Sequence, residues 1–135
     1  MTKVTSPDTY ASESDSFLQA IRLFNINELD CAFEIGKIPT QVKIPVEYFF
    51  CQAKVDSYEK VLHPAPRRQY VITLKGKLKF TVTNGDTFIL EPGIILIAED
   101  TLGPGHSWEI LDGSEWERVY VPIPDDQEFH FNLPL

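Results

Sequence analysis

The chain has 135 residues, a length that fits one domain, and a hydrophobic content of 43% that excludes general disorder. Its formal net charge of −8 argues against nucleic acids and anionic membranes as partners, because both need a basic surface. No apolar run approaches the roughly 20 residues that a membrane-spanning helix requires.

The amino-terminal segment is polar and lacks the apolar core of a signal peptide, so we expect a cytoplasmic protein. We predict a flexible tail over residues 1–16 and a single folded domain over residues 17–135. Cys31 and Cys51 have no metal-binding spacing, and we expect both to be buried free thiols.

Short runs rich in Val, Ile, Phe, Tyr and Thr, divided by Pro, Gly, Asn and Asp, predict β-strands. A short helix over residues 14–21 competes with the first of them. Strands that recur every 8 to 12 residues or so, about seven in all, are typical of an all-β sandwich or barrel. The predicted strands are 20–26, 46–55, 69–76, 77–82, 87–91, 93–99 and 118–123.

The dipeptide Asn84-Gly85 predicts a hairpin, because both residues accept the positive φ angles of a tight turn. A two-residue loop would place Phe80 opposite Ile89, whereas a three-residue loop over 84–86 would place Phe80 opposite Leu90. We favour the longer loop, since it puts the apolar residues on one face.

The run GIILIAE, residues 93–99, shows no alternation of apolar and polar residues. Both of its faces should therefore be buried, either inside a two-sheet sandwich or under a second subunit. Together with an amino-terminal segment that could lie across a neighbour's sheet, this run predicts a homodimer.

Two polar clusters stand at the ends of predicted strands. The stretch HPAPRRQ, residues 63–69, precedes one strand, and AEDTLGPGH, residues 98–106, follows another. Each cluster contains a histidine, His63 or His106. In a sandwich or barrel, strand ends of this kind can converge on one mouth, which is where ligands commonly bind.

Residues 61–123 resemble the cupin superfamily, whose small β-barrels are built around two motifs. The first motif, His-x-His, then Glu, then Gly, matches the run from His63 to Gly76. The second motif, Pro-Gly, a short strand and a histidine, matches the run from Pro92-Gly93 to His106. The resemblance implies a cupin-type small β-barrel, also described as a double-stranded β-helix or jelly-roll sandwich.

The match departs from the family at the metal ligands. A metal-binding cupin uses two histidines and a glutamate of the first motif, but here Ala65 replaces one histidine and Gln69 the glutamate. A neutral amide oxygen is a weaker ligand than a carboxylate. We therefore prefer no cofactor. If a divalent Fe, Mn, Zn or Ni ion is bound, its ligands would be His63, Gln69 and His106, with waters.

The same residues suit acid–base chemistry without a metal. Histidine has an ordinary pKa of about 6.5, so His63 and His106 can act as base and acid near neutral pH. Gln69 can bind a substrate oxygen, and Arg67, on the same strand face, can bind an acidic group. The sugar-nucleotide ketoisomerase branch of the cupins also has a glutamine at the position of Gln69, although it keeps both histidines.

Further residues are open to two interpretations. Asp100 either caps the loop that follows it or orients His106. Tyr48 and Phe50 share one face of their strand and form either core or pocket wall. We treat Arg67, Asp100, Tyr48 and Phe50 as candidate substrate-binding residues, and assign the two tryptophans to the core or an interface.

The function that the sequence favours is a small-molecule enzyme with non-oxidative proton-transfer chemistry, of the isomerase, dehydratase or cyclase type. Its substrate would carry a carbonyl and an acidic group, and its catalytic residues would be His63, His106 and Gln69. One alternative is a metal-dependent cupin, such as an oxygenase, with a His/Gln/His site. The other is a barrel that binds a small ligand without catalysis.

Overall fold

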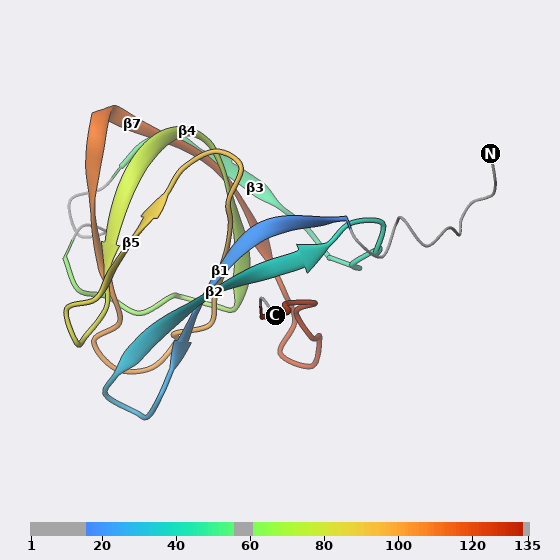
Figure 1. Cartoon of the computed structure of the whole chain (residues 1–135), viewed down its shortest axis with the longest axis horizontal. Helices are drawn as coiled ribbons and strands as arrows, with labels where there is room; N and C mark the ends of the chain where they lie inside the picture. Colours follow the sequence, from blue (N-terminus) through green and yellow to red (C-terminus); the bar gives the residue numbers. More distant parts are fainter. Residues whose placement is uncertain (1–15, 56–60, 134–135) are drawn as a thin grey trace.

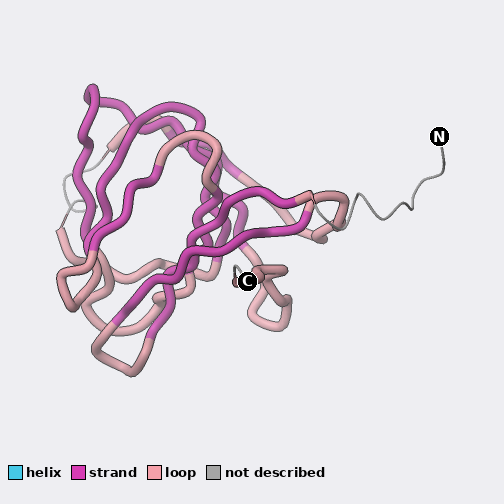
Figure 2. The backbone as a smooth tube through the Cα atoms, viewed as in Figure 1, coloured by secondary structure: helices cyan, strands magenta, loops and turns pink. Residues whose placement is uncertain are grey.

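The computed structural model describes residues 16–55 and 61–133, and every regular element in them is a β-strand (Figures 1 and 2). This confirms the all-β prediction. None of these residues forms a helix that could cross a membrane. The predicted tail over 1–16 lies outside the described residues except for its last position. The strands are β1 (Phe17–Asn25), β2 (Cys31–Pro39), β3 (Phe50–Gln52), β4 (Gln69–Thr81), β5 (Thr87–Leu90), β6 (Ile95–Ala98) and β7 (Ser107–Pro122).

The strands form one mixed sheet with the order β2-β1-β6-β4-β7-β3, and β5 pairs with the second half of β4. The β1–β6 pair is parallel, and the other pairs are antiparallel. The sheet curls around a common interior, with the long strands β4 and β7 on one side (Figure 1). Among the described residues no pairing joins the end strands β2 and β3, so the sheet is not closed.

The register brings one inward-facing row of side chains across five strands. Ile21 of β1 lies opposite Leu96 of β6, which lies opposite Val71 of β4. Val71 in turn lies opposite Tyr120 of β7, and Tyr120 opposite Phe50 of β3. Since side chains alternate along a strand, the residues two positions away in each strand face the same interior.

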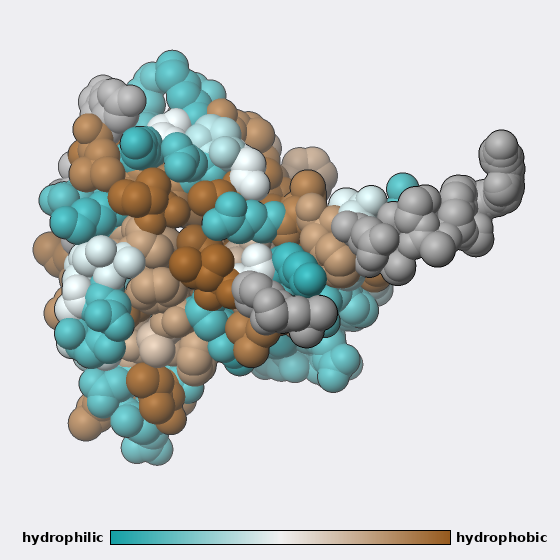
Figure 3. All heavy atoms as spheres, in the orientation of Figure 1, coloured by the Kyte–Doolittle hydropathy of each residue, from teal (hydrophilic) through white to brown (hydrophobic). Residues whose placement is uncertain are grey.

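Strand β6 is buried on both faces, as its uniform apolar sequence predicts. Leu96 packs into the interior cluster, whereas Ile97 packs on the outer face of the sheet. The carboxyl-terminal segment of the chain covers that outer face with Phe129 and Phe131. On the face seen in Figure 3, apolar and hydrophilic residues are interspersed, and several apolar residues lie near the middle of the face.

Several predicted strand boundaries were wrong. Residues 17–25 form a strand, so the described part of the competing helix over 14–21 is not helical. Strand β2 was not predicted, and the strand predicted over 46–55 is limited to 50–52. The strand predicted over 118–123 is the end of β7, which begins at Ser107.

The two strands predicted over 69–76 and 77–82 are one strand, β4. Gly76 interrupts it with a positive φ of 123°, at a point where the register against β7 shifts. A bulge of this kind bends a strand without ending it, which lets β4 follow the curled sheet.

The hairpin at Asn84-Gly85 forms, with a register that neither predicted loop gives. Phe80 lies opposite Phe88, and a backbone bond of 3.0 Å from Val82 N–H to the Asp86 carbonyl closes a loop over 83–85. This register differs from that of the favoured longer loop by two residues. The assignment of faces is therefore unchanged, and Phe80 and Phe88 are both buried.

Both cysteines are free, as predicted. Cys31 is buried in the interior cluster, but Cys51 is exposed, which corrects the prediction for the second thiol. Cys51 belongs to β3, an end strand of the sheet, and its side chain is exposed there.

Candidate functional site

A cavity of about 370 Å³ lies on the inner side of the sheet. Side chains of β3, β4, β6 and β7 and of the segment before β4 line it. The aromatic part of the lining consists of Phe50, Phe80, Trp108, Trp116 and Tyr120. The polar part consists of Gln52, His63, Arg67, Gln69 and His106.

His63 and His106 lie side by side in this cavity. Two backbone hydrogen bonds join them, 2.9 Å from His63 N–H to the His106 carbonyl and 3.0 Å in the reverse direction. Their ring centroids are 5.0 Å apart. The two sequence motifs thus meet through a short antiparallel bridge.

Gly105 makes this close approach possible. Its φ is +75°, and a Cβ added to it would lie 2.1 Å from the carbonyl oxygen of His63. Any other residue would push the two segments apart, because no side chain fits in that space. The glycine beside the second-motif histidine therefore has a direct role in the geometry of the site.

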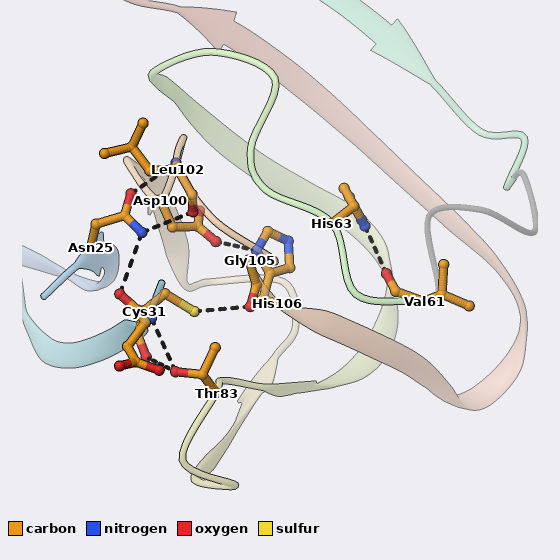
Figure 4. Close-up of polar contacts among 10 residues, drawn as sticks. Asn25, Cys31, Val61, His63, Thr83, Asp100, Leu102, Gly105 and His106 are labelled. Carbon is orange, nitrogen blue, oxygen red and sulfur yellow. Dashed lines mark hydrogen bonds and ion pairs between the residues drawn. The ribbon is translucent and has the colours of Figure 1, made fainter. Parts of the chain in front are cut away.

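Asp100 orients the ring of His106. Its carboxylate is completely buried, and Oδ2 lies 2.5 Å from His106 Nδ1 (Figure 4). A carboxylate accepts hydrogen bonds, so Nδ1 carries the hydrogen and Nε2 carries the lone pair of the neutral ring. Figure 4 shows this second nitrogen on the side of the ring away from Asp100, toward His63. Of the two roles considered for Asp100, the geometry matches the orienting one.

The backbone around Asp100 holds its side chain in place. The Asp100 carbonyl accepts a 3.0 Å bond from Ala65 N–H, which ties the end of β6 to the first motif. The neighbouring Glu99 points to the other face of the sheet, where it pairs with Arg22 at 2.6 Å and with Arg68 at 3.3 Å. Glu99 and Asp100, which follow β6, therefore make their side-chain contacts on opposite faces of the sheet.

His63 has its own fixed orientation. Its Nδ1 lies 2.9 Å from the Val61 carbonyl, and because a carbonyl only accepts, Nδ1 donates (Figure 4). The neutral forms of His63 and His106 therefore both carry the hydrogen on Nδ1, and Nε2 is the basic atom of each ring.

Gln69 and Arg67 contact each other as their alternation predicts. Arg67 Nη1 donates to Gln69 Oε1 over 3.1 Å, while Arg68 faces the opposite side of the sheet. Gln69 is 3% exposed, whereas Arg67 is exposed and its guanidinium lies 5.8 Å from the centre of the Phe50 ring. Since the amide oxygen is bonded to Arg67, the amide N–H groups of Gln69 are the ones available to an acceptor in the cavity.

Of the aromatic pair predicted on one strand, Phe50 lines the cavity, but Tyr48 is not among the residues that line it. Tyr48 precedes β3 and is 52% exposed, with its ring stacked on Phe50 at 6.4 Å between centroids. It supports the cavity wall from outside.

The residues present do not fit the metal site that the cupin resemblance implies. The described residues contain no group of three His, Cys, Asp or Glu side chains placed to hold a metal ion. Ala65 offers no ligand. The oxygen of Gln69 already accepts from a guanidinium, whose positive charge opposes a divalent cation at the same atom.

Sequence reasoning missed the wall formed by β3 and β7. Arg118 is completely buried behind Gln52 and Tyr120, both of which line the cavity. The alternation in the run RVYVPI puts Arg118 and Tyr120 on one strand face, and that signal was available. The two tryptophans lie in the core as expected, and they also line the cavity, with ring centroids 4.9 Å apart.

Comparisons with protein-family models, curated proteins and solved structures found no match. The chemistry of the cavity is therefore the basis for a functional proposal.

Proposed function

We propose that this chain is a cupin-type enzyme that moves protons at a carbon next to a carbonyl group, as an isomerase, dehydratase or cyclase. One observation carries the proposal: a completely buried carboxylate, Asp100, is bonded at 2.5 Å to a histidine, His106, that lines an aromatic cavity. A carboxylate that fixes the tautomer of a histidine leaves Nε2 as a directed base.

The proposed reaction begins with His106. Its Nε2 takes a proton from the carbon, and the positive charge that develops on the ring is stabilised by the carboxylate of Asp100. The electron pair of the broken C–H bond moves into an enolate. His63, whose ring centroid lies 5.0 Å from that of His106, enters this step protonated on both ring nitrogens, and its Nε2–H gives a proton to a second carbon or to a departing oxygen. His63 thereby becomes neutral, and the proton taken up by His106 passes to solvent or back to His63 before the next turnover.

Gln69 and Arg67 would bind the oxygen atoms of the substrate. The amide N–H groups of Gln69 are suited to the carbonyl oxygen, on which negative charge develops as the enolate forms. Arg67 lies beside it and suits an acidic group of the substrate.

The predicted homodimer and cytoplasmic location stay predictions.

The test is deuterium exchange at activated carbons in D₂O, followed by proton NMR. The probes are phenylpyruvate, which combines a ring, a carbonyl and a carboxylate, and further 2-oxo acids and 1,3-dicarbonyl compounds. The protein should accelerate exchange, and His106→Gln should lower the rate at least about 100-fold, the ordinary contribution of a general base. His130→Gln is the matched control, because His130 is the third histidine and does not line the cavity.

Two outcomes would contradict the proposal. Exchange that is absent, or unchanged in both His63→Gln and His106→Gln, would favour a barrel that binds a ligand without catalysis. Stoichiometric iron or manganese in protein purified without added metal would favour the metal-dependent alternative.

A further inference from the structure

The aromatic wall of the cavity contains a hydrogen-bond donor that the proposed reaction does not use, the indole N–H of Trp108. This residue lies on β7 opposite Phe80 of β4, is 4% exposed and lines the cavity. Its ring centroid lies 6.4 Å from that of Phe80 and 4.9 Å from that of Trp116. A donor in such apolar surroundings normally has a partner, because burying a polar group without one costs free energy.

The two tryptophans of the cavity differ in the state of this donor. Trp116 Nε1 donates to Thr73 Oγ1 over 3.1 Å, so its N–H is satisfied within the protein. None of the described residues accepts a hydrogen bond from Trp108 Nε1. This nitrogen is also not enclosed, since the enclosed side-chain atoms without a partner in the described chain are the Tyr70 hydroxyl and Asp100 Oδ1. The Trp108 N–H therefore opens onto the cavity that its side chain lines.

Gln69 provides a second donor of the same kind. It is 3% exposed and lines the cavity, its oxygen accepts from Arg67, and its amide N–H groups have no acceptor among the described residues. Gln69 begins β4, whereas Phe80, the partner of Trp108, lies near the other end of that strand. The ring of His106 lies 5.4 Å from that of Phe80. The cavity thus has an unpaired donor toward each end of β4.

We propose that the ligand of this cavity is a small planar ring compound and that the Trp108 N–H binds a neutral acceptor atom on its ring. The acceptor is a ring nitrogen, or a carbonyl or ether oxygen. One N–H cannot replace the several hydrogen bonds that a carboxylate makes with water, so a neutral acceptor fits this position. The faces of Phe80 and Trp116 suit the ring, and a volume of about 370 Å³ suits a small ligand.

This inference extends the proposed function to a substrate class, ring ketones with a second acceptor. A carbonyl at Gln69 and a ring acceptor at Trp108 would use both unpaired donors at once. That a carbon beside the carbonyl reacts at His106 rests on the proposed function; the acceptor site at Trp108 does not.

The experiment uses 4-acetylpyridine, whose ring nitrogen lies opposite its acetyl group, and acetophenone, which has the same shape without that nitrogen. Each is titrated into nitrogen-15-labelled protein, whose two tryptophans give two indole N–H signals. We expect 4-acetylpyridine to bind with a Kd of about 1 mM or below and to move the Trp108 indole proton downfield, because the proton enters a hydrogen bond. Acetophenone should not move it downfield. The Trp116 signal is the internal reference, since that N–H stays bonded to Thr73.

Trp108→Phe removes the donor together with part of the packing. Both probes lose the same packing, so the ratio of their affinities reports the hydrogen bond alone. We expect the affinity of 4-acetylpyridine relative to acetophenone to fall about fivefold, the contribution of one neutral hydrogen bond. Trp116→Phe is the matched control and should leave the ratio unchanged, because its N–H is already bonded to Thr73.

The indole signal of the wild type keeps the test decisive if Trp108→Phe does not fold. His106→Gln should abolish deuterium exchange but preserve the affinity ratio and the downfield shift, which separates this inference from the proposed catalysis. Three results would overturn it: no binding of 4-acetylpyridine up to about 10 mM, binding without a downfield shift of the Trp108 proton, or the same affinity ratio in Trp108→Phe as in the wild type.

Discussion

The buried carboxylate of Asp100 holds the ring of His106, with 2.5 Å between Oδ2 and Nδ1. The second carboxylate oxygen, Oδ1, is buried and has no hydrogen-bond partner among the described residues. The carboxylate therefore acts on the histidine through one oxygen. This relationship fixes which nitrogen of His106 is basic, and the proposed proton transfer depends on it.

Asp100→Asn should remove that control. An asparagine can present its amide N–H₂ to Nδ1, which favours the opposite tautomer and withdraws the lone pair from the cavity. Deuterium exchange into phenylpyruvate should fall at least about 100-fold. Nitrogen-15 NMR of the ring should show His106 protonated on Nδ1 in the wild type and on Nε2 in the variant. Asp125→Asn, at an exposed position of the carboxyl-terminal segment, is the control; equal rates in both variants would refute the role of Asp100.

Gly105→Ala should separate the two histidines. The substitution combines a positive φ with a Cβ placed 2.1 Å from the His63 carbonyl oxygen. We expect a loss of more than about 3 kcal/mol in the free energy of unfolding, measured with urea. Gly85→Ala is the matched control, because Gly85 has a φ of +93° and no atom within 4 Å of an added Cβ. It should cost about 1 to 2 kcal/mol, the price of the backbone conformation alone; similar losses for both variants would contradict the close approach at Gly105.

The meeting of His63 and His106 was predictable from the sequence, because both stand at the ends of apolar strands and match the spacing of a two-motif barrel. Asp100 was a candidate partner because it lies only six residues before His106 in the connecting loop. The hairpin faces were also predictable, since the apolar residues of both strands fit one face, but the exact register depends on loop geometry that Asn84-Gly85 does not determine.

Other features depend on long-range pairing and leave little local signal. The first part of β7 contains Glu109, a charged and exposed residue. A charged residue interrupts the apolar run that would otherwise predict a strand there. From the neighbouring sequence alone we expect Arg118 at the surface, because it is a charged residue at the start of an apolar run. Its burial follows from the pairing of β3 with β7, which places Gln52 and the Lys54 carbonyl around the guanidinium.

The stability of the fold should fall in alkaline solution. Burial raises the pKa of the Cys31 thiol above 9.0 and the pKa of the Tyr70 hydroxyl above 10.0. The unfolded chain loses these protons at the ordinary values while the folded chain keeps them, so the free energy of unfolding falls as pH rises above about 9. In urea unfolding between about pH 8 and pH 11, Tyr70→Phe should show a shallower decline above pH 10 than the wild type. Identical slopes would contradict the contribution of Tyr70.

Restoring the two missing ligands should create a metal site if the cupin resemblance is correct. Ala65 and Gln69 both line the cavity with His63 and His106, so Ala65→His with Gln69→Glu supplies the usual set of three histidines and a glutamate. A carboxylate at position 69 also replaces the neutral amide that now accepts from Arg67. We expect the double variant to bind Ni²⁺ or Zn²⁺ at least about 100-fold more tightly than the wild type in isothermal titration, because two strong ligands are added. His106→Gln in that background should reverse the gain; affinity that stays at the wild-type level, or that survives loss of His106, would count against the assignment of the two motifs.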